Sequence, residues 1–191
     1  MIELVFASNN SNKLGEIRNL LPKGCTLLTL ADIGCKDELP ETGNTIEANA
    51  LQKARYLYDH FKVNCFADDS GLEIDSLNGE PGVHSAYYAG FGRNAIKNNK
   101  LVLNKLSGNS NRIARFKTVI AYIHNGEQFL FEGILNGTIA YAEKGINGFG
   151  YDPIFIPDGL DRTLAELTAE EKNKISHRSQ AMAKLVQHLM V

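Results

Sequence analysis

Hydrophobic and polar positions at the start of the chain follow one another in blocks that predict a strand, a loop and a helix. Residues 2–7 form an apolar run of strand length, and the polar residues 8–13 separate it from apolar residues at helical spacing over residues 14–21. Pro22 ends this helical pattern, because proline cannot continue a helix. This order is typical of a chain that alternates strands and helices.

The next segments repeat the alternation. Residues 27–30 predict a second strand, residues 46–61 a long helix and residues 63–67 a buried strand. We expect this strand to end in a turn over residues 68–71, since a glycine there lets the backbone turn. Residues 72–75 alternate like a short separate strand. The buried stripe of the long helix is predicted to consist of Ile46, Ala50, Ala54, Leu57 and Phe61.

The middle of the chain has the pattern of an antiparallel sheet. An Asn-Gly pair at residues 125–126, the strongest hairpin signal in the sequence, joins apolar runs over residues 114–123 and 128–134. A second Asn-Gly pair, at residues 136–137, predicts another turn into residues 138–141. Antiparallel strands after an alternating start indicate an α/β or α+β protein with a mixed sheet.

Three more helices are predicted. The first covers residues 94–106, with Ile96 among its apolar positions. Thr168 and Glu171 have capping-box spacing and begin a short helix, and the final helix begins near residue 176.

Composition limits the kinds of partner. The chain has 191 residues, enough for one large domain or two intimate lobes, with 43% hydrophobic and 22% charged residues. Its net charge of −2 supplies no general basic field, so we expect no nucleic-acid partner. No apolar run approaches membrane-spanning length, and residues 1–7 lack the positive start of an export signal. We therefore expect a cytoplasmic protein without membrane association. Cys25, Cys35 and Cys65 are too far apart to indicate a disulfide framework or a zinc site.

Adjacent carboxylates at Asp68 and Asp69 are the first candidate for chemistry. If the strand ends there, both side chains can converge on one cation, and Mg²⁺ prefers one or two carboxylates together with phosphate oxygens. Glu41, just before the long helix, is a candidate third carboxylate. The alternative explanations are a solvated Asp pair in a turn and a Glu that only favours the helix dipole.

The polar loop before the first helix is a candidate phosphate site. A strand, a loop and a helix start present backbone N–H groups to an anion, and Lys13 adds a positive charge. Helix capping alone would explain the same Asn and Ser residues.

Two later segments suggest a site for a flat ligand. Gly148 and Gly150 flank Phe149, leaving an aromatic face on which a nucleobase can stack, although a core Phe is the alternative. His177 and Arg178 oppose the dipole at the start of the last helix, and a ligand with a keto oxygen would explain these two donors.

Five motifs in sequence order resemble the inosine triphosphate pyrophosphatase family. They are Ser8-Asn9-Asn10-x-x-Lys13, Glu41-Thr42-Gly43, Ala67-Asp68-Asp69-Ser70-Gly71-Leu72, Gly148-Phe149-Gly150-Tyr151-Asp152-Pro153-Ile154-Phe155 and Ser176-His177-Arg178. The resemblance implies one domain over residues 1–191, an α/β fold whose elongated, mixed, twisted sheet is flanked by helices, and two lobes with a deep active-site cleft. It also implies a homodimer and Mg²⁺-dependent hydrolysis of ITP, dITP and XTP to the monophosphate and pyrophosphate.

The resemblance also assigns roles to residues of this chain. Asp69 would accept a proton and bind metal together with Asp68 and Glu41, while Lys13 and Lys53 would act on the phosphates. The implied substrate-binding residues are Ser8, Asn9, Asn10, Ser11, Asn12, Lys13, Ser70, Phe149, Gly150, Tyr151, Asp152, Lys172, His177 and Arg178. Family members often carry Arg where this chain has Tyr87, so that segment is left out of the site.

Two other interpretations remain. Maf-like nucleotide pyrophosphatases carry out the same reaction on other bases, but Phe149 and the His177-Arg178 pair fit an inosine-type pocket better. A nucleotide-binding module without catalysis would not need the carboxylates of Glu41, Asp68 and Asp69.

Overall fold

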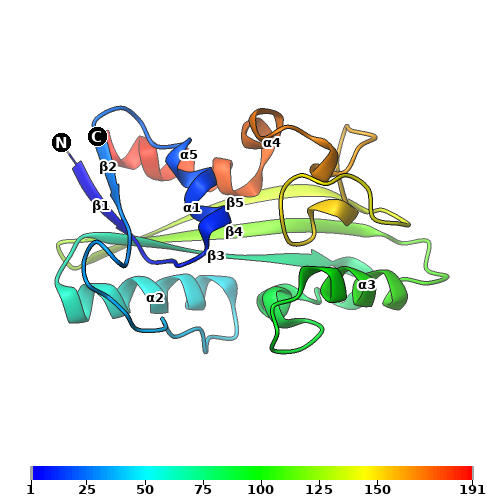
Figure 1. The fold of residues 1–191 in the computed structure, drawn as a ribbon, viewed down its shortest axis with the longest axis horizontal. Coiled ribbons are helices and arrows are strands. Elements are labelled where there is room, and N and C mark those ends of the chain that lie inside the picture. The colour runs from blue at the N-terminus through cyan, green and yellow to red at the C-terminus, as the bar shows by residue number, and fades with distance from the viewer. Residues whose placement is uncertain (1, 191) are drawn as a thin grey trace. The chain divides into compact units, whose positions relative to one another are not determined.

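The computed structural model describes residues 2–190 and contains a mixed sheet with helices (Figure 1). The elements in order are β1 Ile2–Phe6, α1 Ser11–Arg18, β2 Cys25–Leu28, α2 Ile46–Phe61, β3 Cys65–Ile74, α3 Ala95–Lys105, β4 Ile113–His124, β5 Glu127–Ile139, β6 Phe155–Pro157, α4 Ala169–Ile175 and α5 His177–Leu189. The six strands lie in the order β2-β1-β3-β4-β5-β6. Strand β1 pairs in parallel with β2 and β3, whereas β5 and β6 pair antiparallel. The prediction of an α/β protein with a mixed sheet is confirmed.

The chain divides into two compact units, and each is built from separate stretches of sequence. Unit 1 comprises residues 1–69, 118–133 and 178–191, and unit 2 comprises residues 70–117 and 134–177. Strands β3, β4 and β5 contribute residues to both units. Among residues 2–190, no helix has the length and apolar character needed to cross a membrane.

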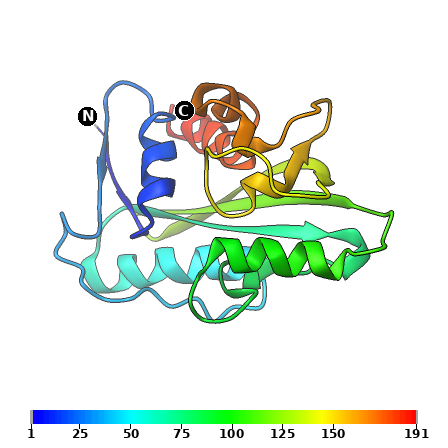
Figure 2. The same cartoon turned by 45° about the vertical axis from the view of Figure 1, so that its right-hand side comes forward.

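Unit 1 has α2 on one face of its strands and α1 and α5 on the other (Figures 1 and 2). Helix α2 begins and ends where the sequence predicts, because the Thr45 side chain accepts a hydrogen bond from the Ala48 N–H and Lys62 adopts a left-handed conformation after Phe61. The core on the α1 and α5 face consists of Leu4, Phe6, Ile17, Phe66, Ile120, Tyr122, Ala181, Met182 and Leu185.

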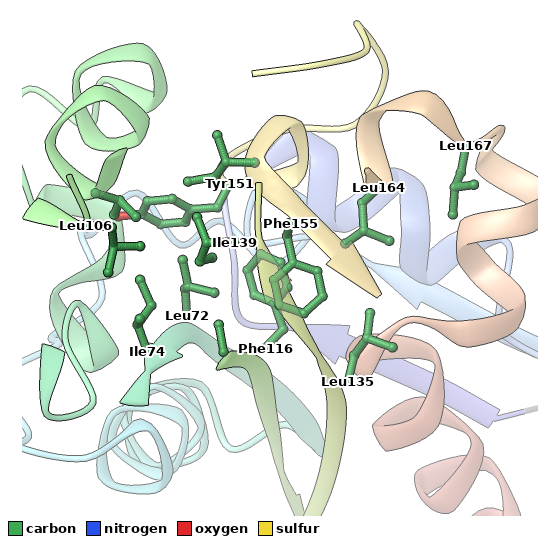
Figure 3. Close-up of a cluster of buried hydrophobic side chains, with 13 residues drawn as sticks. Leu72, Ile74, Leu106, Phe116, Leu135, Ile139, Tyr151, Phe155, Leu164 and Leu167 are labelled. Carbon is green, nitrogen blue, oxygen red and sulfur yellow. The ribbon is translucent and has the colours of Figure 1, made fainter. Parts of the chain in front are cut away.

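Unit 2 has α3 on one face of its strands (Figure 2), and β6 pairs with β5 at the edge of the sheet. Its core gathers side chains from β3, β4, β5 and β6, and the Phe116 and Phe155 rings lie with centroids 4.6 Å apart (Figure 3). The predicted capping box of α4 is confirmed, since Thr168 and Glu171 exchange backbone-to-side-chain hydrogen bonds. Ile96 was expected among the apolar positions of the α3 region, but its side chain is 60% exposed, whereas Asn98 and Asn99 are buried.

The predicted turn over residues 68–71 is wrong, and β3 runs without interruption from Cys65 to Ile74. Carboxylates inside a strand need not end it when cations compensate them on both faces. Asp68 and Asp69 have such partners, as described below. The separate strand predicted over residues 72–75 is therefore the second half of β3.

The predicted turn at Asn136-Gly137 is also wrong, because both residues lie inside β5. Gly137 pairs with Pro157 of β6. A Cβ atom at this position would lie 2.2 Å from the Ile156 carbonyl oxygen and 2.8 Å from the Phe155 ring. The glycine is thus required by the close approach of β6 and not by a change of direction.

We expect Gly137→Ala to lower the free energy of unfolding by about 1–3 kcal/mol, because the new methyl group forces β6 away from β5. Urea denaturation measures this change. Gly92→Ala is the matched control, since a Cβ at Gly92 meets nothing within 4 Å. Equal stability of the two variants would contradict the steric explanation.

Candidate active site

Successive residues of a strand point to opposite faces, and Asp68 and Asp69 follow this rule in β3. The partners of Asp68 lie on α1 and α5, whereas the partner of Asp69 lies on α2. The two carboxylates therefore form ion pairs with different cations of unit 1, although Lys53 also acts to lower the pKa of Asp68 and Lys13 acts to lower that of Asp69.

Asp68 is fully buried between two cations. Its Oδ1 atom accepts a hydrogen bond from Lys13 Nζ at 3.0 Å, and its Oδ2 atom accepts one from Arg178 Nε at 3.0 Å. Arg178 is buried as well and pairs through Nη1 with Glu16 of α1. Burial works to raise the pKa of Asp68, but Lys13 and Arg178 outweigh it and hold this pKa well below its usual range. Asp68 is consequently ionised throughout the physiological pH range.

Asp69 and Glu41 share one ammonium group. Lys53 Nζ, on α2, lies 2.5 Å from Glu41 Oε1 and 3.3 Å from Asp69 Oδ1. Burial raises the pKa of Asp69, although Lys53 acts against this shift. Burial works to lower the pKa of Lys53, but Asp69 and Glu41 together raise it, so Lys53 stays charged. Two carboxylates from distant parts of the chain thus converge on a single positive charge.

Side chains of α2 also hold the segment that carries Glu41. The Thr42 N–H donates to Gln52 Oε1 at 2.9 Å, and Gln52 Nε2 donates back to Thr42 Oγ1 at 2.8 Å. The Gly43 N–H donates to Asn49 Oδ1 at 2.7 Å, where a Cβ on Gly43 would lie 2.8 Å from the same oxygen. Asn49 and Gln52, which lie on the same helix as Lys53, therefore hold the segment that places Glu41 beside Lys53.

The polar segment 8–13 is shorter as a loop than predicted, because α1 already begins at Ser11. Asn10 is the N-cap, and its Oδ1 atom accepts hydrogen bonds from the N–H groups of Asn12 and Lys13. The capping explanation therefore holds for Asn10. The side chains of residues 8–13 are exposed or half-buried, and the Lys13 side chain reaches Asp68.

In unit 2, residues 148–152 form a loop organised by the carboxylate of Asp152. Asp152 Oδ2 accepts hydrogen bonds from the Phe149 N–H at 2.8 Å and from Lys172 Nζ at 2.6 Å. Gly148 has a φ of 72°, and a Cβ there would lie 2.0 Å from the same oxygen. Lys172 Nζ also lies 4.8 Å from the centroid of the half-buried Phe149 ring. Three predicted base-pocket residues are thus brought together.

Other predicted residues of unit 2 have individual contacts. His177 stacks on Phe116, with ring centroids 4.7 Å apart and an interplanar angle of 10°. Tyr151 is buried, and its hydroxyl donates to the Ser85 carbonyl oxygen at 2.7 Å. Ser70 lies half-buried in β3. The loop, Lys172 and the His177 ring therefore supply an aromatic face together with polar groups.

Arg178 was predicted for the base pocket, and the structure pairs it with Asp68 and Glu16. These ion pairs explain a cation near the start of α5, which the helix dipole alone disfavours.

Three residues with evident roles in the site were not found from the sequence. Glu16 lies one turn after Lys13 on α1, and this spacing was the available signal. Asn49 and Gln52 are polar positions of α2, and no sequence pattern indicates that their side chains bind the backbone N–H groups of Gly43 and Thr42.

No group of three or more His, Cys, Asp or Glu side chains within residues 2–190 lies in an arrangement that could hold a metal ion. The predicted metal ligands Glu41, Asp68 and Asp69 form ion pairs with cationic side chains. Glu41 and Asp69 meet at Lys53, whereas Asp68 faces Lys13 and Arg178.

Comparison with known proteins gives consistent matches over nearly the full length. The model of the Ham1 family matches residues 4–188. A dITP/XTP pyrophosphatase of Flavobacterium johnsoniae is 51% identical over 185 residues, which cover 97% of this chain and 96% of that protein. A solved HAM1 protein from Coxiella burnetii is 40% identical, with a TM-score of 0.92 and coverage of 100% and 99%.

A solved nucleoside-triphosphatase, described as a dITP/XTP pyrophosphatase, from Mycobacterium abscessus is 44% identical, with a TM-score of 0.80 and coverage of 97% of this chain and 99% of that one. The resemblance found in the five sequence motifs is confirmed by the family match and by these relatives. On this evidence the chain belongs to the Ham1 family.

Proposed function

We propose that this chain is a nucleoside-triphosphate pyrophosphatase that hydrolyses dITP, XTP and ITP to the nucleoside monophosphate and pyrophosphate. The observation that carries the proposal is the convergence of Glu41 and Asp69 on Lys53, in the same unit as the Asp68–Lys13 pair. Buried carboxylates and lysines in this arrangement suit a polyphosphate and its counter-ion. The relatives described as dITP/XTP pyrophosphatases indicate the same substrates.

The residues fit Mg²⁺ at one place. Glu41 and Asp69 already bring two carboxylates to a single cation, and Mg²⁺ usually takes one or two carboxylates besides phosphate oxygens and waters. We therefore assign metal binding to Glu41 and Asp69. Asp68, expected as a third ligand, is engaged by Lys13 and Arg178 and would act by holding those cations in place. A bound Mg²⁺ would neutralise phosphate charge and make a water molecule more acidic.

The chain's own groups would carry the rest of the reaction. Asp69, whose pKa is raised by burial, accepts the proton of the attacking water, and a raised pKa makes a carboxylate a better base near neutral pH. Water adds at the phosphorus of the innermost phosphate, the bond to the leaving pyrophosphate breaks, and Lys13 and Lys53 stabilise the charge that develops. Ser8 to Asn12 would bind the phosphates at the start of α1.

Base selection is assigned to unit 2. Phe149 would stack on the purine, and Lys172 and His177 would donate toward the oxygen at its six position, with Gly150, Tyr151 and Asp152 shaping the loop. Adenine carries an amino group there and would leave these donors unpaired. Guanine has the oxygen, so we expect its exclusion to come from the surroundings of the two position, where guanine has an amino group, xanthine an oxygen and hypoxanthine a hydrogen.

The proposal includes the finer features that the resemblance implies. These are a single domain of two lobes with a deep active-site cleft, Ser70 as a substrate contact, Arg178 near the base, a homodimer and a cytoplasmic location. They rest on the family resemblance of the five motifs.

The test is a substrate panel. Purified protein with Mg²⁺ is given dITP, ITP, XTP, ATP, GTP and modified pyrimidine triphosphates, and pyrophosphate release is followed. We expect turnover of the three oxo-purine triphosphates at least about a hundredfold more efficiently than that of ATP, because a site built to hydrogen-bond an oxygen rejects an amino group. Removal of Mg²⁺ with a chelator should stop the reaction.

Two other results would replace the proposal. A preference for modified pyrimidine triphosphates would favour a Maf-like pyrophosphatase. Binding of dITP without release of any pyrophosphate would favour a nucleotide-binding module.

A further inference from the structure

We propose that Asn99 of α3 is a positioning residue for base recognition, which fixes the Gly150 peptide group and thereby the orientation of Phe149 and Asp152. This inference rests on the proposed function, because it assigns a specificity role within the same base-binding loop.

Asn99 is 2% exposed. Its Nδ2 atom donates a hydrogen bond to the Gly150 carbonyl oxygen at 3.2 Å. Gly150 stands between Phe149 and Tyr151 in the loop that Asp152 organises. A side chain on a rigid helix thus holds the central peptide of the loop.

The turn that contains Gly150 is closed by a backbone hydrogen bond from the Asp152 N–H to the Phe149 carbonyl oxygen at 3.2 Å. Gly150 has a φ of 65°, and a Cβ placed there meets no atom within 4 Å, so side-chain packing at this residue does not help to hold the turn. Side-chain contacts hold the neighbouring residues: the Asp152 carboxylate accepts from the Phe149 N–H, and the Tyr151 hydroxyl donates to the Ser85 carbonyl oxygen. Asn99 adds to these contacts a side-chain hydrogen bond to the Gly150 carbonyl oxygen itself.

The neighbouring Asn98 is a useful comparison, because its hydrogen bonds are those of an asparagine with a structural role. Asn98 is also buried, and both of its polar ends are satisfied. Its Oδ1 accepts from the Ala89 N–H at 2.8 Å, and its Nδ2 donates to the carbonyl oxygens of Ser85 and Ala86 at 3.2 and 3.1 Å. Asn98 supports the segment next to α3 and contributes to stability.

Asn99 differs, because its buried Oδ1 atom has no hydrogen-bond partner among residues 2–190. A buried acceptor without a partner reduces stability, so the amide is a poor choice for stability alone. The presence of an asparagine at position 99 is explained if its Nδ2 contact with Gly150 contributes to substrate binding. This difference predicts opposite results for the same substitution at two adjacent positions.

The experiment compares Asn99→Leu, Asn98→Leu and Asn104→Leu with the wild-type full-length chain. Leucine has the same branched outline as asparagine and is a better helix former. For Asn99→Leu we expect an unchanged or higher Tm, a KM for dITP raised about tenfold, a kcat within about threefold of wild type, and a reduced preference for dITP over dATP. Asn98→Leu should lower the Tm, and the exposed Asn104→Leu should change neither quantity.

The outcomes separate this inference from the proposed function. A wild-type chain that releases no pyrophosphate from dITP overturns both. An active wild type with unchanged KM and selectivity in Asn99→Leu overturns the role of Asn99 alone. A fall in Tm as large as that of Asn98→Leu would show that Asn99 is kept for stability and would also overturn the inference.

Discussion

Asp68→Asn is expected to lower the free energy of unfolding by about 3–5 kcal/mol, the usual cost of removing one partner from a buried ion pair. The wild-type carboxylate is fully buried and compensates both Lys13 and Arg178. Asparagine keeps the shape but removes the charge, so the half-buried Lys13 and the buried Arg178 lose their shared carboxylate, while Glu16 still pairs with Arg178. Urea denaturation in metal-free buffer measures the difference.

The same difference should depend on pH in a defined direction. The pKa of Asp68 is lowered in the folded protein, so its contribution to stability is complete above the pKa of an unfolded aspartate, near about 4. As the pH falls below that value, the contribution is progressively lost, and the stabilities of wild type and Asp68→Asn should approach each other. Asp59→Asn, at an exposed position of α2, is the control and should stay within about 0.5 kcal/mol of wild type. A difference that is constant from pH 7 to pH 3 would contradict the ion-pair account.

Asp69→Asn is expected to reduce kcat for dITP by about 10²–10⁴, the usual contribution of a general base, while the fold is retained. Lys53 keeps Glu41 as a partner at 2.5 Å when the charge of Asp69 is removed, so no buried cation is left alone. We expect the free energy of unfolding to change by less than about 1 kcal/mol. Pyrophosphate release under saturating dITP and Mg²⁺, together with urea denaturation, measures both quantities.

Asp59→Asn again serves as the control, with wild-type turnover expected. Wild-type activity in Asp69→Asn would remove Asp69 from the mechanism. A loss of stability comparable to that of Asp68→Asn would show that the carboxylate is structural, and activity would then have to be explained by other residues.

These two predictions give adjacent residues of one strand opposite roles. The alternation of β3 directs Asp68 toward the cations of α1 and α5 and Asp69 toward Lys53 of α2. One aspartate is placed where charge compensation supports the fold, and the other is placed where a second carboxylate, Glu41, joins it at a cation.

Local patterns were sufficient for much of the fold. The helix over residues 46–61, the Asn125-Gly126 hairpin and the Thr168 capping box were predicted correctly, because helical periodicity, turn chemistry and capping act between residues close in sequence. The turns predicted at Gly71 and Gly137 failed. In both places a local turn signal was outweighed by contacts with distant segments, which were the cations facing β3 and the close approach of β6.

The sequence by itself determined the family, because the motifs that carry Lys13, Glu41, Asp69 and Phe149 are recognisable from short stretches of sequence in a fixed order. Only the tertiary structure decided which charges meet. That Arg178 joins Asp68, 110 residues away in the chain, depends on how α5 packs against β3, and no local spacing encodes such a contact. Pairing between distant charged groups is decided by packing, and for this reason the different ion-pair partners of Asp68 and Asp69 became evident only in the folded chain.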